Sequence, residues 1–181
     1  MVGRGDSGRK PTISAFRSKN LIDWEGPFVV FVAEENTWEG INITGIWAPE
    51  IHFYNGKYYI FTTFNTADKL CEQWIDWEPR VIRGSVVLVS ESPLGPFRTF
   101  SNKPMLPADM MTLDGTLIVE DKIPYMVYCH EWVQLVNGTI EVIQLKEDLS
   151  APYNLVEKTI IICGPQRNHR APTRQLQKKG I

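Results

Sequence analysis

The stretch that decides the fold is Ile51-His-Phe-Tyr-Asn-Gly-Lys-Tyr-Tyr-Ile-Phe-Thr-Thr-Phe64. Aromatic and β-branched residues fill both of its halves, and these residue types favour β-strands. Between the halves, Asn55-Gly56 offers the two positive φ angles that a type I′ turn requires. The stretch therefore predicts a β-hairpin.

The same pattern returns further along the chain. A second hairpin is predicted from residues 116–119 and 123–128, and a third from residues 131–136 and 139–145 across Asn137-Gly138. Single strands are expected near residues 28–33, 85–90 and 155–162. Helix is expected to be nearly absent, so the sequence predicts an all-β fold.

A weak internal repeat indicates how these hairpins are arranged. Ser18-Lys-Asn-Leu-Ile-Asp-Trp-Glu-Gly-Pro-Phe28 and Ser90-Glu-Ser-Pro-Leu-Gly-Pro-Phe97 begin about 70 residues apart, a spacing that fits one four-stranded blade. This repeat favours a β-propeller over a β-sandwich, which would also have short strands and frequent turns. About two to three blades cannot close a ring, so we expect open sheet edges and a chain that aggregates or melts at low temperature.

Composition argues against nucleic acid as a partner. With 19 Lys and Arg against 21 Asp and Glu, the net charge of −2 gives no electrostatic reason to bind nucleic acid. Basic residues without any acid gather in residues 165–181. We interpret this segment as a disordered or non-native basic tail behind a domain of residues 1–164, the alternative being an arm that binds polyanions.

The cysteines and the apolar runs argue against a disulfide framework, a metal site and a membrane span. Cys71, Cys129 and Cys163 form no CxxC pair, so we expect buried thiols and neither a disulfide framework nor a metal site. No apolar run is long enough for a membrane span, and the N-terminus shows no signal-peptide core. The chain is therefore cytoplasmic, or its true N-terminus is missing.

Three motifs carry a resemblance to a known family: Ser18-Lys-Asn-Leu-Ile-Asp-Trp-Glu25, Trp47-Ala-Pro-Glu-Ile-His-Phe-Tyr-Asn-Gly-Lys-Tyr-Tyr59 and Leu113-Asp-Gly-Thr-Leu117. Over residues 12–163 the chain resembles glycoside hydrolase family 43, the five-bladed β-propellers that include arabinofuranosidases and xylosidases. The resemblance implies hydrolysis of O-glycosyl bonds in arabinose- or xylose-containing oligo- or polysaccharides by inversion, without a cofactor. It also implies a secreted or periplasmic parent protein.

Inverting hydrolysis needs one protonated carboxyl group to donate to the leaving oxygen and one ionised carboxylate to activate water. A third carboxylate raises the pKa of the acid by like-charge repulsion. The resemblance places Asp114 at this third position. The family's base lies in an Asp-Pro element that has no counterpart before Ser18, and Cys163 precedes Gly164-Pro165 where the acid is expected. We therefore expect a fragment that is itself inactive, through truncation or a reading-frame error near residue 164.

Other residues are candidates for the same site. Glu131 follows the strand after Asp114 and is a second catalytic candidate, as an acid or as a hydroxyl binder, the alternative being a solvent-facing strand residue. Trp47, Glu50 and Trp132 are candidates for substrate binding, because aromatic rings stack on sugars and carboxylates accept their hydroxyl groups. The alternatives are a turn cap for Asp114, core positions for the tryptophans and a turn-stabilising role for Glu50. Two competing functions remain: a glycan-binding propeller without catalysis and a fragment with no function of its own.

Overall fold

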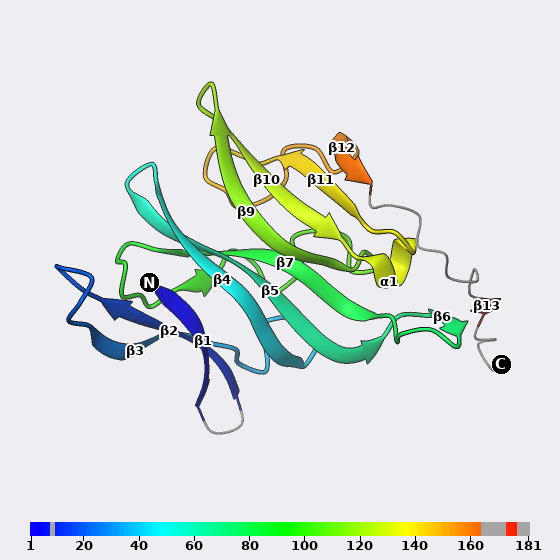
Figure 1. Ribbon diagram of the computed structural model, residues 1–181, viewed down its shortest axis with the longest axis horizontal. Coiled ribbons are helices and arrows are strands. Elements are labelled where there is room, and N and C mark those ends of the chain that lie inside the picture. The colour runs from blue at the N-terminus through cyan, green and yellow to red at the C-terminus, as the bar shows by residue number, and fades with distance from the viewer. Residues whose placement is uncertain (8–9, 164–172, 177–181) are drawn as a thin grey trace.

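The structure is a computed structural model that describes residues 1–7, 10–163 and 173–176, and strands make up most of it (Figure 1). One sheet has the order β1-β2-β3 and contains β1 (Val2–Ser7), β2 (Lys10–Arg17) and β3 (Glu25–Val32). The central sheet has the order β4-β5-β7-β8 and contains β4 (Ile43–Tyr54), β5 (Lys57–Lys69), β7 (Val81–Ser90) and β8 (Arg98–Thr99). The all-β prediction is confirmed.

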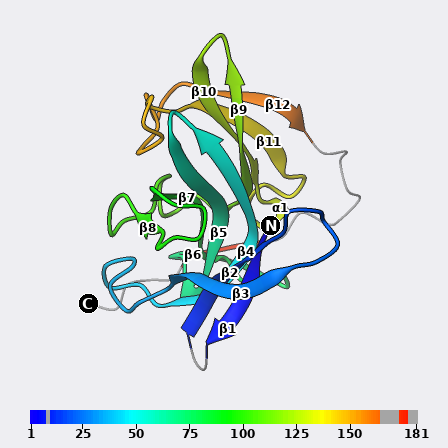
Figure 2. The ribbon, with the colours of Figure 1, turned by 90° about the vertical axis from the view of Figure 1, so that its left-hand side faces the viewer.

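The third sheet has the order β12-β11-β10-β9 and contains β9 (Thr112–Glu120), β10 (Ile123–His130), β11 (Thr139–Gln144) and β12 (Lys158–Cys163). A two-stranded sheet pairs β6 (Glu72–Ile75) with β13 (Thr173–Leu176). Figures 1 and 2 show the central sheet between the first and third sheets. Each large sheet is an antiparallel meander, and together they are successive blades of an incomplete β-propeller.

Strand β5 of the central blade is buried on both of its faces. Because side chains alternate along a strand, β5 places Ile60 and Phe64 in the apolar cluster shared with the first sheet, and Tyr59 and Phe61 in the cluster shared with the third sheet. This explains why the β5 part of the run that decides the fold has apolar residues on both faces of the strand.

The outer strand β12, in contrast to β5, is largely exposed to solvent. It pairs with β11, and it is the last strand of its sheet among the described residues. Its consecutive residues Ile160 and Ile161 are 53% and 52% exposed. The third blade therefore has an apolar edge strand that faces solvent.

The first two predicted hairpins are confirmed. The β4–β5 turn has positive φ at Asn55 (44°) and Gly56 (78°), as a type I′ turn requires. The β9–β10 turn has positive φ at Asp121 (49°) and Lys122 (67°). In both hairpins the two residues with positive φ form the turn between the last paired residues of the strands.

The third predicted hairpin is wrong. Trp132–Leu135 form the short helix α1, and β11 pairs instead with β10 and β12. The carbonyl of Val133 accepts a hydrogen bond from Trp77 Nε1 (2.8 Å), and that of Gln134 accepts one from Arg80 Nη2 (2.7 Å). These distant donors satisfy backbone groups of α1 that a strand would have paired within a hairpin.

The cysteine prediction is also partly wrong, because Cys71 is exposed and Cys129 is only half-buried. Most of the predicted tail, residues 165–181, lies outside the described residues, and its described part is β13. In the part of the chain that is described, no helix has the length and apolar character needed to span a membrane.

Candidate active site

In Figure 1, β5 and β10 end and β7 and β9 begin on the right-hand side of the molecule. Several polar residues lie near these strand ends. Asp114 lies near the start of β9, and Glu131 directly follows β10. Arg83 lies near the start of β7 and is paired in register with Asn65 near the end of β5. Residues that are far apart in the sequence thus meet where the second and third blades adjoin.

Neighbouring residues fix the backbone of Asp114. Its N–H donates to Oγ1 of Thr63 on the neighbouring blade (2.9 Å), and its φ of 54° is in the left-handed region that Asp tolerates better than most residues. The following Gly115 has no room for a side chain, since a Cβ there would lie 3.0 Å from both Met126 Sδ and Ser85 Cβ. The backbone is therefore fixed on both sides of Asp114, while its side chain is exposed.

Glu131 is buried, with 8% of its surface exposed, so it is not a solvent-facing residue. Its backbone N–H donates to the carbonyl of Met111 (2.8 Å), which precedes β9. Nη1 of Arg83 lies 2.5 and 2.6 Å from the two carboxylate oxygens of Glu131. The carboxylate is thus paired across the seam between the two blades.

Arg83 has two further partners. Its Nε donates to Oδ1 of Asn65 (2.8 Å), and its guanidinium carbon lies 4.3 Å from the ring centroid of Trp47. We call Trp47, Asn65, Arg83 and Glu131 the Arg83 cluster. Sequence reasoning missed Arg83 and Asn65, although Arg83 is the only charged residue of β7, an otherwise uncharged strand.

The electrostatics of the Arg83 cluster connect it with Asp114. Burial raises the pKa of Glu131 above its usual value, Arg83 opposes this shift by its charge and hydrogen bonds, and the negative charge of Asp114 adds to it. Burial also raises the pKa of Cys129, and Asp114 contributes again. A buried carboxyl group beside a second carboxylate is an arrangement that active sites use to separate the roles of acid and base.

Another buried carboxylate, Glu141 on β11, serves a different purpose. It is 1% exposed and accepts hydrogen bonds from Tyr128 Oη (2.9 Å), Thr139 Oγ1 (2.9 Å) and Lys158 Nζ (2.8 Å). Burial favours its neutral form, but these donors outweigh that effect, and the pKa of Glu141 is lowered. Because its donors all belong to its own blade, Glu141 is a structural group of the third blade.

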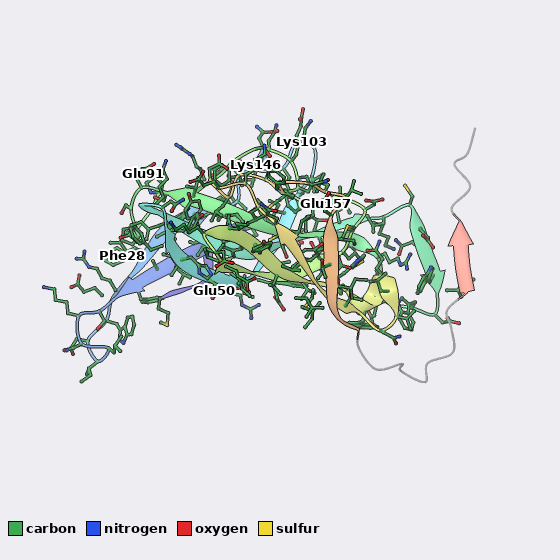
Figure 3. All side chains as sticks on the ribbon, turned by 90° about the horizontal axis from the view of Figure 1, so that it is seen from above. Phe28, Glu50, Glu91, Lys103, Lys146 and Glu157 are labelled. Carbon is green, nitrogen blue, oxygen red and sulfur yellow. The ribbon has the colours of Figure 1, made fainter. Side chains whose placement is uncertain are left out.

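The remaining sequence candidates lie elsewhere. A β-bulge separates Trp47 from Glu50, whose exposed carboxylate lies 3.3 Å from His52 Nε2. Figure 3 shows Glu50 at the surface, well away from α1. Trp132 packs edge-on against Trp77, with ring centroids 5.4 Å apart. The structure thus groups Asp114, Glu131 and Trp47, and it places Glu50 and Trp132 with other partners.

No metal centre accompanies these residues in the described ranges, where no group of three or more His, Cys, Asp or Glu side chains could hold a metal ion. The site itself offers two carboxylates, the guanidinium of Arg83 and the ring of Trp47. Carboxylates and guanidinium groups bind hydroxyl groups, and an indole ring stacks on the C–H face of a sugar.

Several solved structures are similar to this chain. An endo-arabinase from Bacteroides thetaiotaomicron is 29% identical with a TM-score of 0.68, over 90% of this chain and 51% of that one. A thermostable family-43 glycoside hydrolase is 20% identical with a TM-score of 0.65, over 93% and 55% of the two chains. An α-L-arabinofuranosidase from Clostridium thermocellum is 22% identical with a TM-score of 0.55, over 85% and 46%. The chain thus spans about half the length of these structures.

The search of curated proteins gave no match. The family model for glycosyl hydrolases family 43 matches residues 5–164, which include the three sequence motifs, the blades and the candidate site. This chain belongs to glycosyl hydrolases family 43.

Proposed function

We propose that this chain forms part of a glycoside hydrolase that cleaves O-glycosyl bonds in arabinose- or xylose-containing glycans with inversion. Family membership and the 29% identity to an endo-arabinase support this substrate class. The observation that carries the proposal is the exposed carboxylate of Asp114, whose charge acts on the buried carboxyl group of Glu131. A polymeric substrate would place the hydrolase outside the cytoplasm, secreted or periplasmic.

Each residue of the site has a proposed role. Asp114 raises the pKa of a proton-donating acid by like-charge repulsion. Glu131 is the second carboxylate of the site, and Trp47 supplies a stacking surface for one sugar. Glu50 and Trp132 would then contact parts of the glycan beyond that sugar.

Turnover requires a base and an acid on opposite faces of the sugar. Neither has a matched position in this sequence, since no Asp-Pro element precedes Ser18 and Cys163 stands before Gly164. We therefore propose that the 181-residue chain binds glycans with negligible turnover of its own.

One observation favours the competing function, a glycan-binding propeller. The carboxylate of Glu131 is occupied by Arg83, and an ion-paired carboxylate is a poor proton donor. Under this alternative, Asp114 and Glu131 would only bind sugar hydroxyl groups. The alternative differs from the first proposal in the activity of any longer protein that carries this chain.

The test measures binding and turnover separately. Wild-type chain is titrated with linear arabinan and xylan oligosaccharides by calorimetry, and hydrolysis of nitrophenyl arabinofuranoside and xyloside is followed in parallel. We expect binding without turnover, and weaker binding by Asp114→Asn. Asp121→Asn is the matched control, because Asp121 is also exposed and also has a positive φ, but it lies at the opposite end of β9. Absence of any glycan binding would refute the proposal, and robust turnover would refute the assigned roles.

A further inference from the structure

Arg83 contacts side chains from three separate parts of the fold. Its guanidinium is in contact with Trp47 on β4, with Asn65 on β5 and with Glu131 after β10, and its side chain is only 13% exposed. A buried ion pair is by itself weak evidence for stability, because desolvation of both charges offsets their attraction. The arrangement therefore calls for a functional explanation.

The first contact opposes the protonation of Glu131. Burial and the neighbouring Asp114 both favour the protonated carboxyl group, and Arg83 opposes them. An arginine side chain stays charged at every pH at which proteins are folded. Arg83 therefore presents Glu131 with a constant positive charge that favours its ionised, hydrogen-bond-accepting form.

The second contact decides the orientation of Trp47. The guanidinium of Arg83 lies over one face of the indole, which fixes the plane of the ring. Asn65 in turn fixes the guanidinium through the hydrogen bond to Nε. Trp47 keeps partial exposure, so its ring can be contacted from outside the cluster.

We propose that Arg83 is a positioning residue of the glycan site, which holds the Glu131 carboxylate as an acceptor for sugar hydroxyl groups and orients the Trp47 ring for stacking. The proposal rests on the proposed function, because it assumes that the site takes a glycan. Arg83 itself acts through Glu131 and Trp47.

The test compares Arg83→Met and Arg83→Lys with Arg17→Met and Arg17→Lys in the full chain. Arg17 is a matched control, because it also pairs with a glutamate, Glu25, and lies 5.5 Å from the Phe28 ring centroid, but it is 59% exposed. The first readout needs no glycan: the titration of the Glu131 carboxyl group, followed by carbon NMR of labelled glutamate. The second readout is the affinity for arabinan oligosaccharides.

Arg83→Met should move the titration of Glu131 to higher pH and weaken glycan binding by about tenfold or more, the typical effect of losing a hydrogen bond to a charged group. Arg83→Lys keeps the charge but loses the planar group, so it should restore the titration of Glu131 without restoring affinity. The Arg17 variants should change neither readout.

Two outcomes separate the two proposals. If wild-type chain binds no oligosaccharide, the proposed function fails, whatever happens to the titration of Glu131. If Arg83→Met leaves both the titration and the affinity unchanged, the positioning role is overturned. Should Arg83→Met not fold, the double variant Arg83→Met with Glu131→Gln removes both charges together, and wild-type affinity in that variant would overturn the role equally.

Discussion

Two parts of the molecule each combine an arginine, a glutamate and an aromatic ring, one at the exposed surface and one shielded from solvent. In the first blade, Nε and Nη2 of Arg17 lie 2.8 and 2.6 Å from Glu25 Oε2, and the arginine lies near the ring of Phe28. The side chains of Arg17 and Glu25 are 59% and 61% exposed, and Figure 3 shows Phe28 near the tip of this blade.

At the seam between the second and third blades, Arg83, Glu131 and Trp47 repeat this chemistry with exposures of only 13% and 8% for the charged pair. Water and salt screen the first pair, so it contributes little to stability. The second pair is shielded from solvent, so each partner depends on the other. The two trios have the same types of contact, so burial decides which of them can position the side chains of a binding site.

The largest expected effect comes from removing one partner of the buried pair. Glu131→Ala leaves the charge of Arg83 buried and unpaired, which should lower the free energy of unfolding by roughly 3–5 kcal/mol. Glu25→Ala removes an exposed partner and should cost less than about 1 kcal/mol. Urea unfolding measures both. Equal losses for the two variants would contradict the comparison.

A smaller effect is expected from filling the seam. A Cβ at Gly115 would lie 3.0 Å from Met126 Sδ and Ser85 Cβ, so Gly115→Ala should destabilise the chain by about 1–3 kcal/mol through overpacking. In the first blade, Gly3 has nothing within 4 Å of its ideal Cβ. Gly3→Ala should leave the midpoint of thermal unfolding unchanged or slightly raised. A Gly115→Ala variant as stable as wild type would mean that the seam can open without cost.

The pH dependence of stability should differ in sign between the two buried carboxyl groups. Glu141 has a lowered pKa in the folded state, so its stabilisation is present above the unfolded value and is lost as pH falls through the folded one. Glu131 has a raised pKa, so its contribution is complete at low pH and is lost as pH rises through the folded value.

Glu141→Gln should therefore flatten the loss of stability on the acid side, and Glu131→Gln should flatten the change above the usual glutamate pKa. Urea unfolding between about pH 3 and pH 7 separates the two limbs. Glu25→Gln is the exposed control and should leave both limbs in place. The same limb vanishing in both buried variants would show that the two groups titrate together.

The smallest expected effect is at Asp114. Asp114→Asn keeps a residue that tolerates a positive φ and changes only an exposed side chain, so stability should stay within about 0.5 kcal/mol of wild type. Because Asp114 helps to raise the pKa of Glu131, that pKa should fall in the variant. Carbon NMR of labelled glutamate gives the direction of the shift, with Asp121→Asn as the unshifted reference.

Local chemistry made the blades predictable. Asn55-Gly56 supplies positive φ angles at a hairpin wherever it stands between two strand-forming runs, and the structure confirms that turn. Asn137-Gly138 has the same letters, but there the positive φ angles are at Val136 and Gly138, and a helix precedes them. The difference lies in Trp77 and Arg80, which reach the carbonyls of α1 from more than 50 residues away.

The candidate site was predictable only in part, for the same reason. The Leu113–Leu117 and Trp47–Tyr59 motifs identified Asp114 and Trp47 because each motif is continuous in sequence. Glu131 was a sequence candidate as well, but its partner Arg83 is 48 residues away, and the two meet only when two blades pack together. A single charge within an uncharged strand was the available signal, but it gave no information about its partner.

The outer strand β12 has a consequence for the behaviour of the chain in solution. Its run Lys158-Thr-Ile-Ile-Ile-Cys163 has the composition from which intermolecular β-sheets nucleate, and Ile160 and Ile161 are exposed to solvent. A lysine on an edge strand usually repels a second copy, but the ammonium group of Lys158 is engaged with Glu141. The charge added by an Ile160→Lys substitution should therefore lower the turbidity of concentrated solutions relative to wild type.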